Sequence, residues 1–178
     1  VRQVVVCPYA GCGWRMKGNV AGRVATAIMV EDRGGAAVAP QKLEDALEAH
    51  PDAGLVAFVH AETSTGAQSD AKTLVELAHK YNCLTIVDAV TSLAGTPLKV
   101  DEWDIAAISS GSQKCRSAPP GLSAVSFHER ADEQTRNRNS RVQSGVLDLH
   151  RATGERGGEG TRDASRTRRG TCRARLQV

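Results

Sequence analysis

The chain has 178 residues, of which 40% are hydrophobic, 24% charged and only 3% aromatic, and its net charge is +3; this is enough for one domain with an aliphatic core. It contains neither an apolar run near the roughly 18 residues of a membrane span nor a signal segment at its start, so we expect a cytoplasmic protein that does not enter the membrane. The five cysteines form no CxxC pair and the five histidines no HxH or HxxxH pair, which argues against a disulfide framework and against a metal site.

Strand and helix patterns alternate along the chain. Short apolar runs predict strands, and apolar residues at helical spacing between Pro, Gly and Asn signals predict helices. The elements expected in this way are strands over 3–7, 26–30, 55–60, 84–88, 104–108 and 122–127 and helices over 14–24, 41–50 and 71–81. Ser69 and Asp70 are expected to cap the last helix, and Cys7 and Cys83, which lie in apolar runs, to be core thiols.

The pattern fades after about residue 131, although 137–149 could be helical in part. Residues 151–178 contain eight arginines, no lysine and three acidic residues, and apolar residues almost disappear. Such a composition cannot bury enough surface to offset the entropy of ordering. We therefore predict a disordered arginine-rich tail on a slightly acidic body.

The alternation of strands and helices predicts an α/β fold with a mostly parallel sheet and helices on both faces. In such folds the ligand lies beyond the carboxyl ends of the strands. Three polar clusters follow predicted strands here: 60–66, Asp88 and 109–114. We expect them to meet at one edge of the sheet and to form a site there.

Lys114 is the chemically distinctive residue of the third cluster. It lies in the stretch Ser109-Ser-Gly-Ser-Gln-Lys114, where small neighbours leave a ligand room to approach. A desolvated lysine has a lowered pKa, and its neutral amine attacks carbonyl groups. By itself, however, this stretch favours the plainer interpretation, in which Lys114 is an ordinary lysine of a surface loop.

The other two clusters supply what a lysine–aldehyde site requires. Asp88 comes 26 residues before Lys114, and the hydroxyl-rich stretch 62–66 comes before Asp88. Pyridoxal phosphate needs a lysine for its aldehyde, a carboxylate for its ring nitrogen, and donors for its phenolic oxygen and phosphate. The three clusters together therefore favour a pyridoxal-phosphate site.

Three spaced motifs resemble those of the class V aminotransferases, and within them the alanine–glyoxylate and serine–pyruvate aminotransferase group. The motifs are His60-Ala-Glu-Thr-Ser-Thr-Gly66, Val87-Asp-Ala-Val-Thr-Ser-Leu-Ala-Gly-Thr-Pro97 and Ser110-Gly-Ser-Gln-Lys114 followed by Ala118-Pro-Pro-Gly121. The resemblance implies that 1–130 is part of the large domain of a fold-type I pyridoxal-phosphate transferase, with 1–35 matching poorly. It extends loosely over 131–150 and ends at the tail, 151–178.

Carried over position by position, the resemblance implies that Lys114 forms the Schiff base and shuttles the proton, and that Asp88 pairs with the ring nitrogen. It also implies that Thr63 hydrogen-bonds the phenolic oxygen, that Gln113 reaches the phosphate and that Val90 packs against the ring. Three of the five have a plainer alternative: Val90 could be a core residue, Thr63 the cap of a turn and Asp88 the cap of a following helix.

The activity implied by the resemblance is transfer of an amino group from alanine or serine to glyoxylate or pyruvate by a homodimer. The alternatives are another class V activity, such as a desulfurase or a lyase, and a fragment without catalysis. The family's phosphate loop, its stacking aromatic, its Tyr-His-His-Thr segment and its C-terminal domain with the substrate-carboxylate arginine have no clear counterpart here, so we expect impaired activity.

Two interpretations of the tail remain. Its reading frame could have been lost near residue 150, or it could be a basic arm that binds nucleic acid. The tail has no aromatic residue on which a base could stack, so we favour the first interpretation and expect no nucleic-acid partner.

Overall fold

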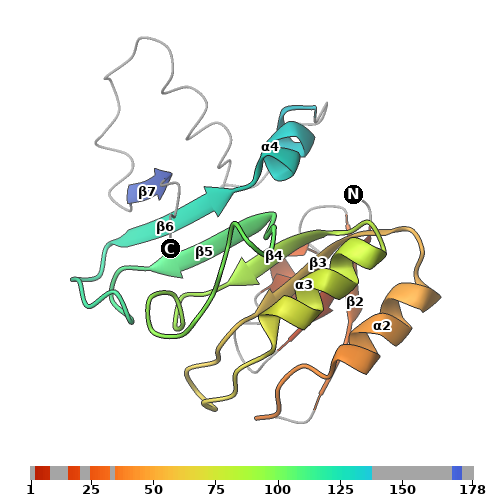
Figure 1. Ribbon diagram of the computed structural model, residues 1–178, viewed down its shortest axis with the longest axis horizontal. Helices are drawn as coiled ribbons and strands as arrows, with labels where there is room; N and C mark the ends of the chain where they lie inside the picture. Colours follow the sequence, from red (N-terminus) through yellow and green to blue (C-terminus); the bar gives the residue numbers. More distant parts are fainter. Residues whose placement is uncertain (1–2, 9–15, 21–24, 33–34, 138–169, 174–178) are drawn as a thin grey trace.

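The computed structural model describes residues 3–8, 16–20, 25–32, 35–137 and 170–173. Seven strands form one sheet in the order β2-β1-β3-β4-β5-β6-β7 (Figure 1). The elements are β1 (Gln3–Cys7), β2 (Thr26–Met29), α2 (Pro40–Ala49), β3 (Ala53–Val59), α3 (Ala71–Lys80), β4 (Leu84–Asp88), β5 (Ala107–Gly111), β6 (Leu122–Phe127), α4 (Glu129–Arg136) and β7 (Gly170–Arg173). All neighbouring strands are parallel except β5 and β6, which confirms the predicted mostly parallel α/β sheet.

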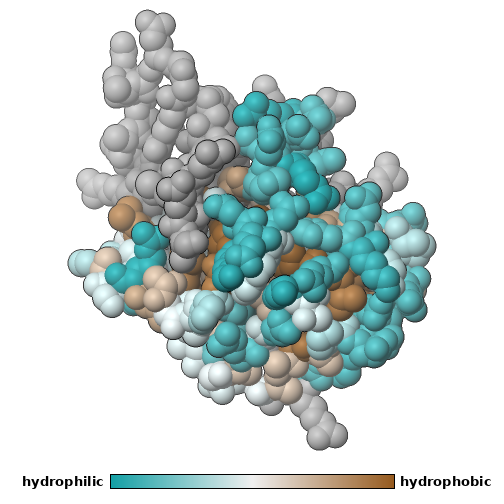
Figure 2. All heavy atoms as spheres, viewed as in Figure 1, coloured by the Kyte–Doolittle hydropathy of each residue, from teal (hydrophilic) through white to brown (hydrophobic). Residues whose placement is uncertain are grey.

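Helices α2 and α3 lie side by side over one face of the sheet (Figure 1). Pro40 occupies the first turn of α2, where its missing N–H would have no helical partner. Asp70 caps α3, and its side chain accepts a hydrogen bond from Thr73 N at 3.2 Å. Ser69 does not cap this helix, because its hydroxyl is buried and accepts a bond from Val38 N instead. The outward faces of both helices carry hydrophilic side chains (Figure 2).

The main core lies between these two helices and the sheet. Phe58 of β3, Leu43 and Leu47 of α2 and Leu74 of α3 are almost completely buried in it. Burial of each such side chain contributes about 1.5–3 kcal/mol of transfer free energy. Cys7 and Cys83 are buried free thiols of the same core, as the sequence predicts.

Side chains of β1 alternate between the two faces of the sheet. Val4 and Val6 point away from the main core and form a second cluster with Ala57. Met16 and Val20 of the helical segment 16–20 pack against this cluster, so the prediction of helices on both faces is confirmed. Within the described residues, no helix has the length and hydropathy that a bilayer crossing requires.

The strand that precedes Lys114 begins later than the sequence predicts. The predicted strand covers 104–108, whereas β5 is Ala107–Gly111. Asp104 adopts a left-handed backbone conformation (φ 52°), and Ile105 N donates to Val100 O at 3.0 Å, so these residues still belong to the preceding turn. Polar Ser109 and Ser110 continue the strand because β4 or β6 offers backbone partners at both positions.

Two elements differ from expectation nearer the end of the described chain. The sequence pattern fades at about residue 131 and assigns no element to 129–136, where the structure has α4. This helix buries only Ala131, so its sequence carries no apolar periodicity. The sequence predicts disorder over 151–178, whereas Gly170–Arg173 forms β7 and pairs in parallel with β6. Strand pairing uses backbone groups of an edge strand and does not require apolar side chains. The possible helix within 137–149 and the rest of the tail lie outside the described residues.

Candidate functional site

The carboxyl ends of β3, β4 and β5 lie together at one edge of the sheet. Asp88 is the register partner of both Val59 and Ser109. The backbone contacts continue beyond the strands, since His60 N donates to Asp88 O and Ala89 N to Ser109 O, each at 2.9 Å. The three polar clusters predicted to meet at a sheet edge are therefore brought together. We call this region the site edge: residues 60–68 after β3, 88–92 at the end of β4, and 111–115 at the end of β5.

The first loop of the site edge is shaped by Glu62. Its backbone N–H donates to Ala67 O at 3.0 Å, and its carbonyl accepts from Gly66 N at 2.9 Å. Its buried side chain accepts from the amide and the hydroxyl of Ser64 through Oε1, at 3.0 and 2.9 Å. These bonds close a tight turn that leaves Thr63 exposed at its tip.

Thr63 contacts the neighbouring loop through its side chain. The hydroxyl groups of Thr63 and Thr91 form a short hydrogen bond. The orientation of the Thr63 hydroxyl towards any ligand is therefore restricted by its hydrogen bond with Thr91. Thr91 was not predicted as a site residue, although its place within the Val87–Pro97 motif was the available signal.

His60 ties the first two loops together beneath the site edge. It is 1% exposed, and its Nδ1 lies 2.8 Å from Ser92 Oγ. Its Nε2 lies 3.3 Å from Gln68 Nε2, an amide nitrogen that can only donate, so Nδ1 carries the proton that Ser92 accepts. Burial lowers the pKa of His60, which agrees with a neutral ring.

Asp88 is the carboxylate of the site edge. Its Oδ1 accepts a hydrogen bond from Val90 N at 2.9 Å, so it does cap the following turn. Burial raises the pKa of Asp88 and the negative charge of Glu62 raises it further, whereas the Val90 bond opposes both. The second carboxylate oxygen of Glu62 is buried and has no hydrogen-bond partner among the described residues. The charge of Glu62 thus acts unfavourably on Asp88, and neither carboxylate forms an ion pair within the described part of the chain.

Val90 and Gln113 meet above Gly111 at the end of β5. A Cβ added at Gly111 would lie 2.9 Å from Gln113 Oε1 and 3.5 Å from Val90 Cγ1. Residue 111 must therefore lack a side chain for the Gln113 amide to hold its present position, whereas Val90 would be in ordinary contact with a Cβ. Sequence reasoning did not single out Gly111, although it stands three residues before Lys114.

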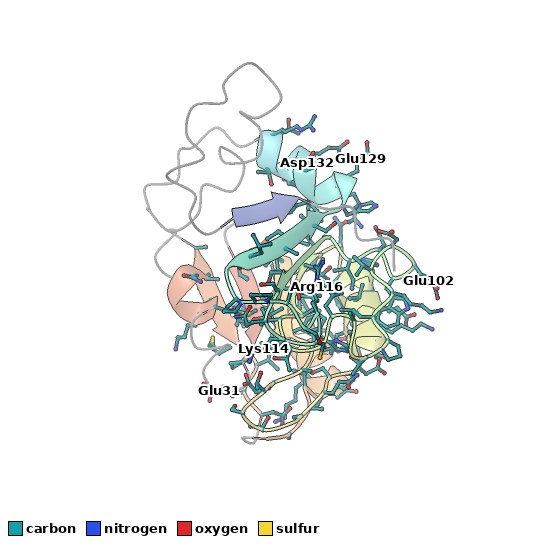
Figure 3. The ribbon with its side chains drawn as sticks, turned by 90° about the vertical axis from the view of Figure 1, so that its left-hand side faces the viewer. Glu31, Glu102, Lys114, Arg116, Glu129 and Asp132 are labelled. Carbon is teal, nitrogen blue, oxygen red and sulfur yellow. The ribbon has the colours of Figure 1, made fainter. Side chains whose placement is uncertain are left out.

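Lys114 lies in the loop that joins β5 and β6, at the opposite end of the sheet from Glu129 and Asp132 of α4 (Figure 3). The base of the loop is held by Ser112, whose hydroxyl donates to Pro119 O at 2.7 Å and whose N–H donates to Leu122 O at 3.0 Å. Lys114 itself is half-buried, and its amine forms no hydrogen bond or ion pair within the described part of the chain.

The five residues singled out from the sequence thus lie on three adjacent strand ends or the loops that follow them. Direct contacts link Asp88 with Val90, and the glycine at 111 brings Val90 close to Gln113. The described residues contain no group of three or more histidine, cysteine, aspartate or glutamate side chains that could hold a metal ion. The chemistry available at this edge is that of an amine, two carboxylates and several hydroxyl groups.

The model of the family described as Aminotransferase class-V matches residues 13–152. The alanine–glyoxylate aminotransferase of Drosophila melanogaster is 34% identical over 82% of this chain and 37% of its own length. That of Felis catus is 39% identical over 61% of this chain and 26% of its own length.

Among solved structures, the alanine–glyoxylate aminotransferase from Nostoc sp. aligns with a TM-score of 0.81 at 31% identity, over 88% of this chain and 41% of that one. The ureidoglycine–glyoxylate aminotransferase from Bacillus subtilis aligns with a TM-score of 0.76, also at 31% identity, over 80% of this chain and 37% of that one. The chain spans less than half the length of each of these relatives.

Proposed function

We propose a function from one premise: the chain belongs to the aminotransferase class-V family. We infer that the protein is a pyridoxal-phosphate-dependent transaminase that moves an amino group from alanine or serine to glyoxylate or pyruvate. The observation that supports this proposal is that the strand ends and loops carrying Lys114, Asp88 and Thr63 lie next to one another at one edge of the sheet.

The residues of the site edge fit pyridoxal phosphate. The Lys114 amine has no competing partner within the described residues, so it is available to bond the aldehyde carbon. The pKa of Asp88 is raised chiefly by burial, and a protonated ring nitrogen would offset that penalty by pairing with the carboxylate. The absence of a side chain at Gly111 leaves room for the Gln113 amide, and Val90 lies next to the same position.

In the proposed reaction each residue has one task. Bound pyridoxal phosphate supplies an electron sink that allows the substrate Cα to lose its proton. Lys114 Nζ would take that proton from the substrate Cα and return it later in the transfer, acting as the general base and then as the general acid. Asp88 would keep the ring nitrogen protonated, and Thr63 would donate a hydrogen bond to the phenolic oxygen.

Two further residues hold the cofactor in place in this proposal. The Gln113 amide binds the phosphate, and Val90 packs against one side of the ring. Both lie beside Gly111, which supports a common contact surface.

The substrate class follows from the relatives. Alanine–glyoxylate and ureidoglycine–glyoxylate aminotransferases share glyoxylate in their names, which supports a small 2-oxo acid as acceptor. The working protein is proposed to be a cytoplasmic homodimer. Its substrates are proposed to be a small amino acid and a 2-oxo acid, and no membrane or nucleic-acid partner is proposed.

The test begins with covalent capture. The 178-residue chain is incubated with pyridoxal phosphate, reduced with borohydride and mapped by mass spectrometry, alongside Lys114→Arg and the control Lys99→Arg. Lys99 is an exposed lysine whose amine lies 2.8 Å from Glu102 Oε2. We expect one adduct, on Lys114, that disappears in Lys114→Arg and persists in Lys99→Arg. An adduct spread evenly over all lysines would overturn the proposal.

The second step measures turnover. Alanine and glyoxylate are added to the chain with cofactor, and formation of pyruvate and glycine is followed together. Formation of both products at equal rates supports transamination. Pyruvate without glycine, in an amount no greater than that of the chain, would show that only the first half of the transfer occurs, and the absence of both products would contradict the proposal for this chain.

A further inference from the structure

The loop that carries Lys114 is fastened to the turn that follows Asp88. The thiol of Cys115 donates a hydrogen bond to Thr91 O at 2.8 Å. The side chain of the same Thr91 contacts Thr63. Thr91 therefore lies between the loop after β3 and the loop after β5 and contacts both.

Gly95 provides the second half of this attachment. A Cβ added at Gly95 would lie 2.4 Å from the Cys115 sulfur and 2.9 Å from the Cys115 Cβ. Real Cβ atoms do not approach other atoms so closely, so Cys115 packs directly on the backbone of residue 95. The need for glycine here comes from this close approach.

The turn beneath Cys115 is itself well fixed. Leu93 N donates to Ala89 O at 3.0 Å, Gly95 N donates to Ser92 O at 2.9 Å, and the Leu93 side chain is buried in the main core. A residue fastened to this turn is therefore held relative to Asp88, which begins it. Lys114 is covalently joined to that residue.

We propose that Cys115 is a positioning residue for Lys114, and that its contacts with Thr91 and Gly95 set the lysine loop in register with the turn that follows Asp88. The inference rests on the proposed function for the chemistry of Lys114, but the attachment itself is independent of any cofactor. Small displacements of a reacting group cost large factors in rate, so the attachment has a direct effect on capture of an aldehyde by Lys114.

The experiment compares four variants of the full chain: Cys115→Ala removes the donor, Cys115→Ser keeps one, Gly95→Ala displaces the sulfur, and Arg116→Ala is the control. Arg116 is the exposed neighbour of Cys115. The first readout is amide hydrogen exchange without cofactor, on peptides covering residues 89–96 and 112–118. The second is the rate at which the borohydride-stable adduct with pyridoxal phosphate forms on Lys114.

We expect Cys115→Ala and Gly95→Ala to raise exchange in both peptides and to slow adduct formation by about five- to tenfold, the size of one lost hydrogen bond. Cys115→Ser is expected to restore both values to within about twofold, and Arg116→Ala to leave them unchanged. A general structural defect would not be rescued by the conservative serine.

The two readouts separate the two proposals. Unchanged exchange in Cys115→Ala would overturn the positioning role, whether or not an adduct forms. Altered exchange with unchanged adduct formation would also overturn it, because the attachment would then not act on Lys114. If the unaltered chain forms no adduct on Lys114 while Cys115→Ala still raises exchange in both peptides, the proposed function fails, whereas the attachment of the lysine loop to the turn after Asp88 stands.

Discussion

Glu62 and Asp88 are carboxylates on neighbouring strand ends, and the charge of Glu62 adds to burial in raising the pKa of Asp88. One oxygen of Glu62 is buried without a hydrogen-bond partner in the described structure. The fold therefore tolerates an unfavourable electrostatic arrangement at the point where the proposed cofactor would place a positive charge. Such arrangements are more common at functional sites than elsewhere.

The first prediction concerns the pH dependence of stability. The folded-state pKa of Asp88 is raised, so the stability that protonated Asp88 contributes is present below about pH 4 and is lost as the pH rises through the folded-state pKa. Asp88→Asn keeps an acceptor for Val90 N and is expected to remove this loss, which makes the cofactor-free variant more stable than the unaltered chain at pH 7. Urea denaturation at several pH values measures this, with exposed Asp101→Asn as the control. A less stable Asp88→Asn at pH 7 would contradict the prediction.

The second prediction tests the coupling of the two acids directly. Glu62→Gln keeps an oxygen for Ser64 but removes the charge, so it is expected to lower the pKa of Asp88 and to stabilise the cofactor-free chain at pH 7. In a double-mutant cycle with Asp88→Asn, we expect a coupling free energy of about 0.5 kcal/mol, because the charge of Glu62 raises the pKa of Asp88. Additive effects of the two substitutions would show that the acids do not interact.

The third prediction concerns His60. Its pKa is lowered by burial, so the stability contributed by the neutral ring is present above about pH 6.5 and is lost as the pH falls toward the folded-state value. His60→Gln is expected to reduce stability at pH 7 by about 1–3 kcal/mol through the lost bond to Ser92, while weakening the pH dependence between pH 6.5 and 5. Urea denaturation at several pH values measures this, and His50→Gln serves as the control. If stability falls between pH 6.5 and 5 in His60→Gln as steeply as in the unaltered chain, His60 is not the cause of that fall.

The fourth prediction concerns Gly111. Gly111→Ala places a methyl group 2.9 Å from the flexible end of Gln113, so Gln113 can move away and the stability cost is expected to stay near 1 kcal/mol. The displaced amide is expected to weaken binding of pyridoxal phosphate by about tenfold, the size of one charge-assisted hydrogen bond. Fluorescence titration and thermal unfolding measure the two effects. Gly18→Ala, which meets no atom within 4 Å, should leave binding unchanged.

Much of the fold could be predicted because apolar runs and helical spacing coincide with buried elements. The run of 84–88 became β4 with the predicted bounds, and Asp70 caps α3 as its position before the apolar spacing indicates. Once the sheet is parallel, its strand ends must share an edge, so the meeting of Asp88 with the polar stretches after β3 and β5 followed from topology.

The remaining features depend on contacts that produce no periodic pattern in the sequence. β5 extends through two serines because backbone partners exist on both sides, which the side chains alone do not reveal. The bond from Cys115 to Thr91 joins positions 24 residues apart and involves a carbonyl oxygen that every residue type possesses. The burial of Glu62 arises because its own loop folds back over it, and nothing in the local composition indicates this.

The reversal of direction between β5 and β6 has a consequence for the order in which the site assembles. Lys114 lies in the connection of a hairpin in which Gly111 pairs with Ser123, so the ladder, the Ser112 bonds and the loop itself all come from one short stretch of chain. Local pairings of this kind form faster than crossovers between distant strands. The loop that carries Lys114 can therefore form early in folding. Pairing of β4 with β5 would then bring this loop, already folded, to the strand end that carries Asp88.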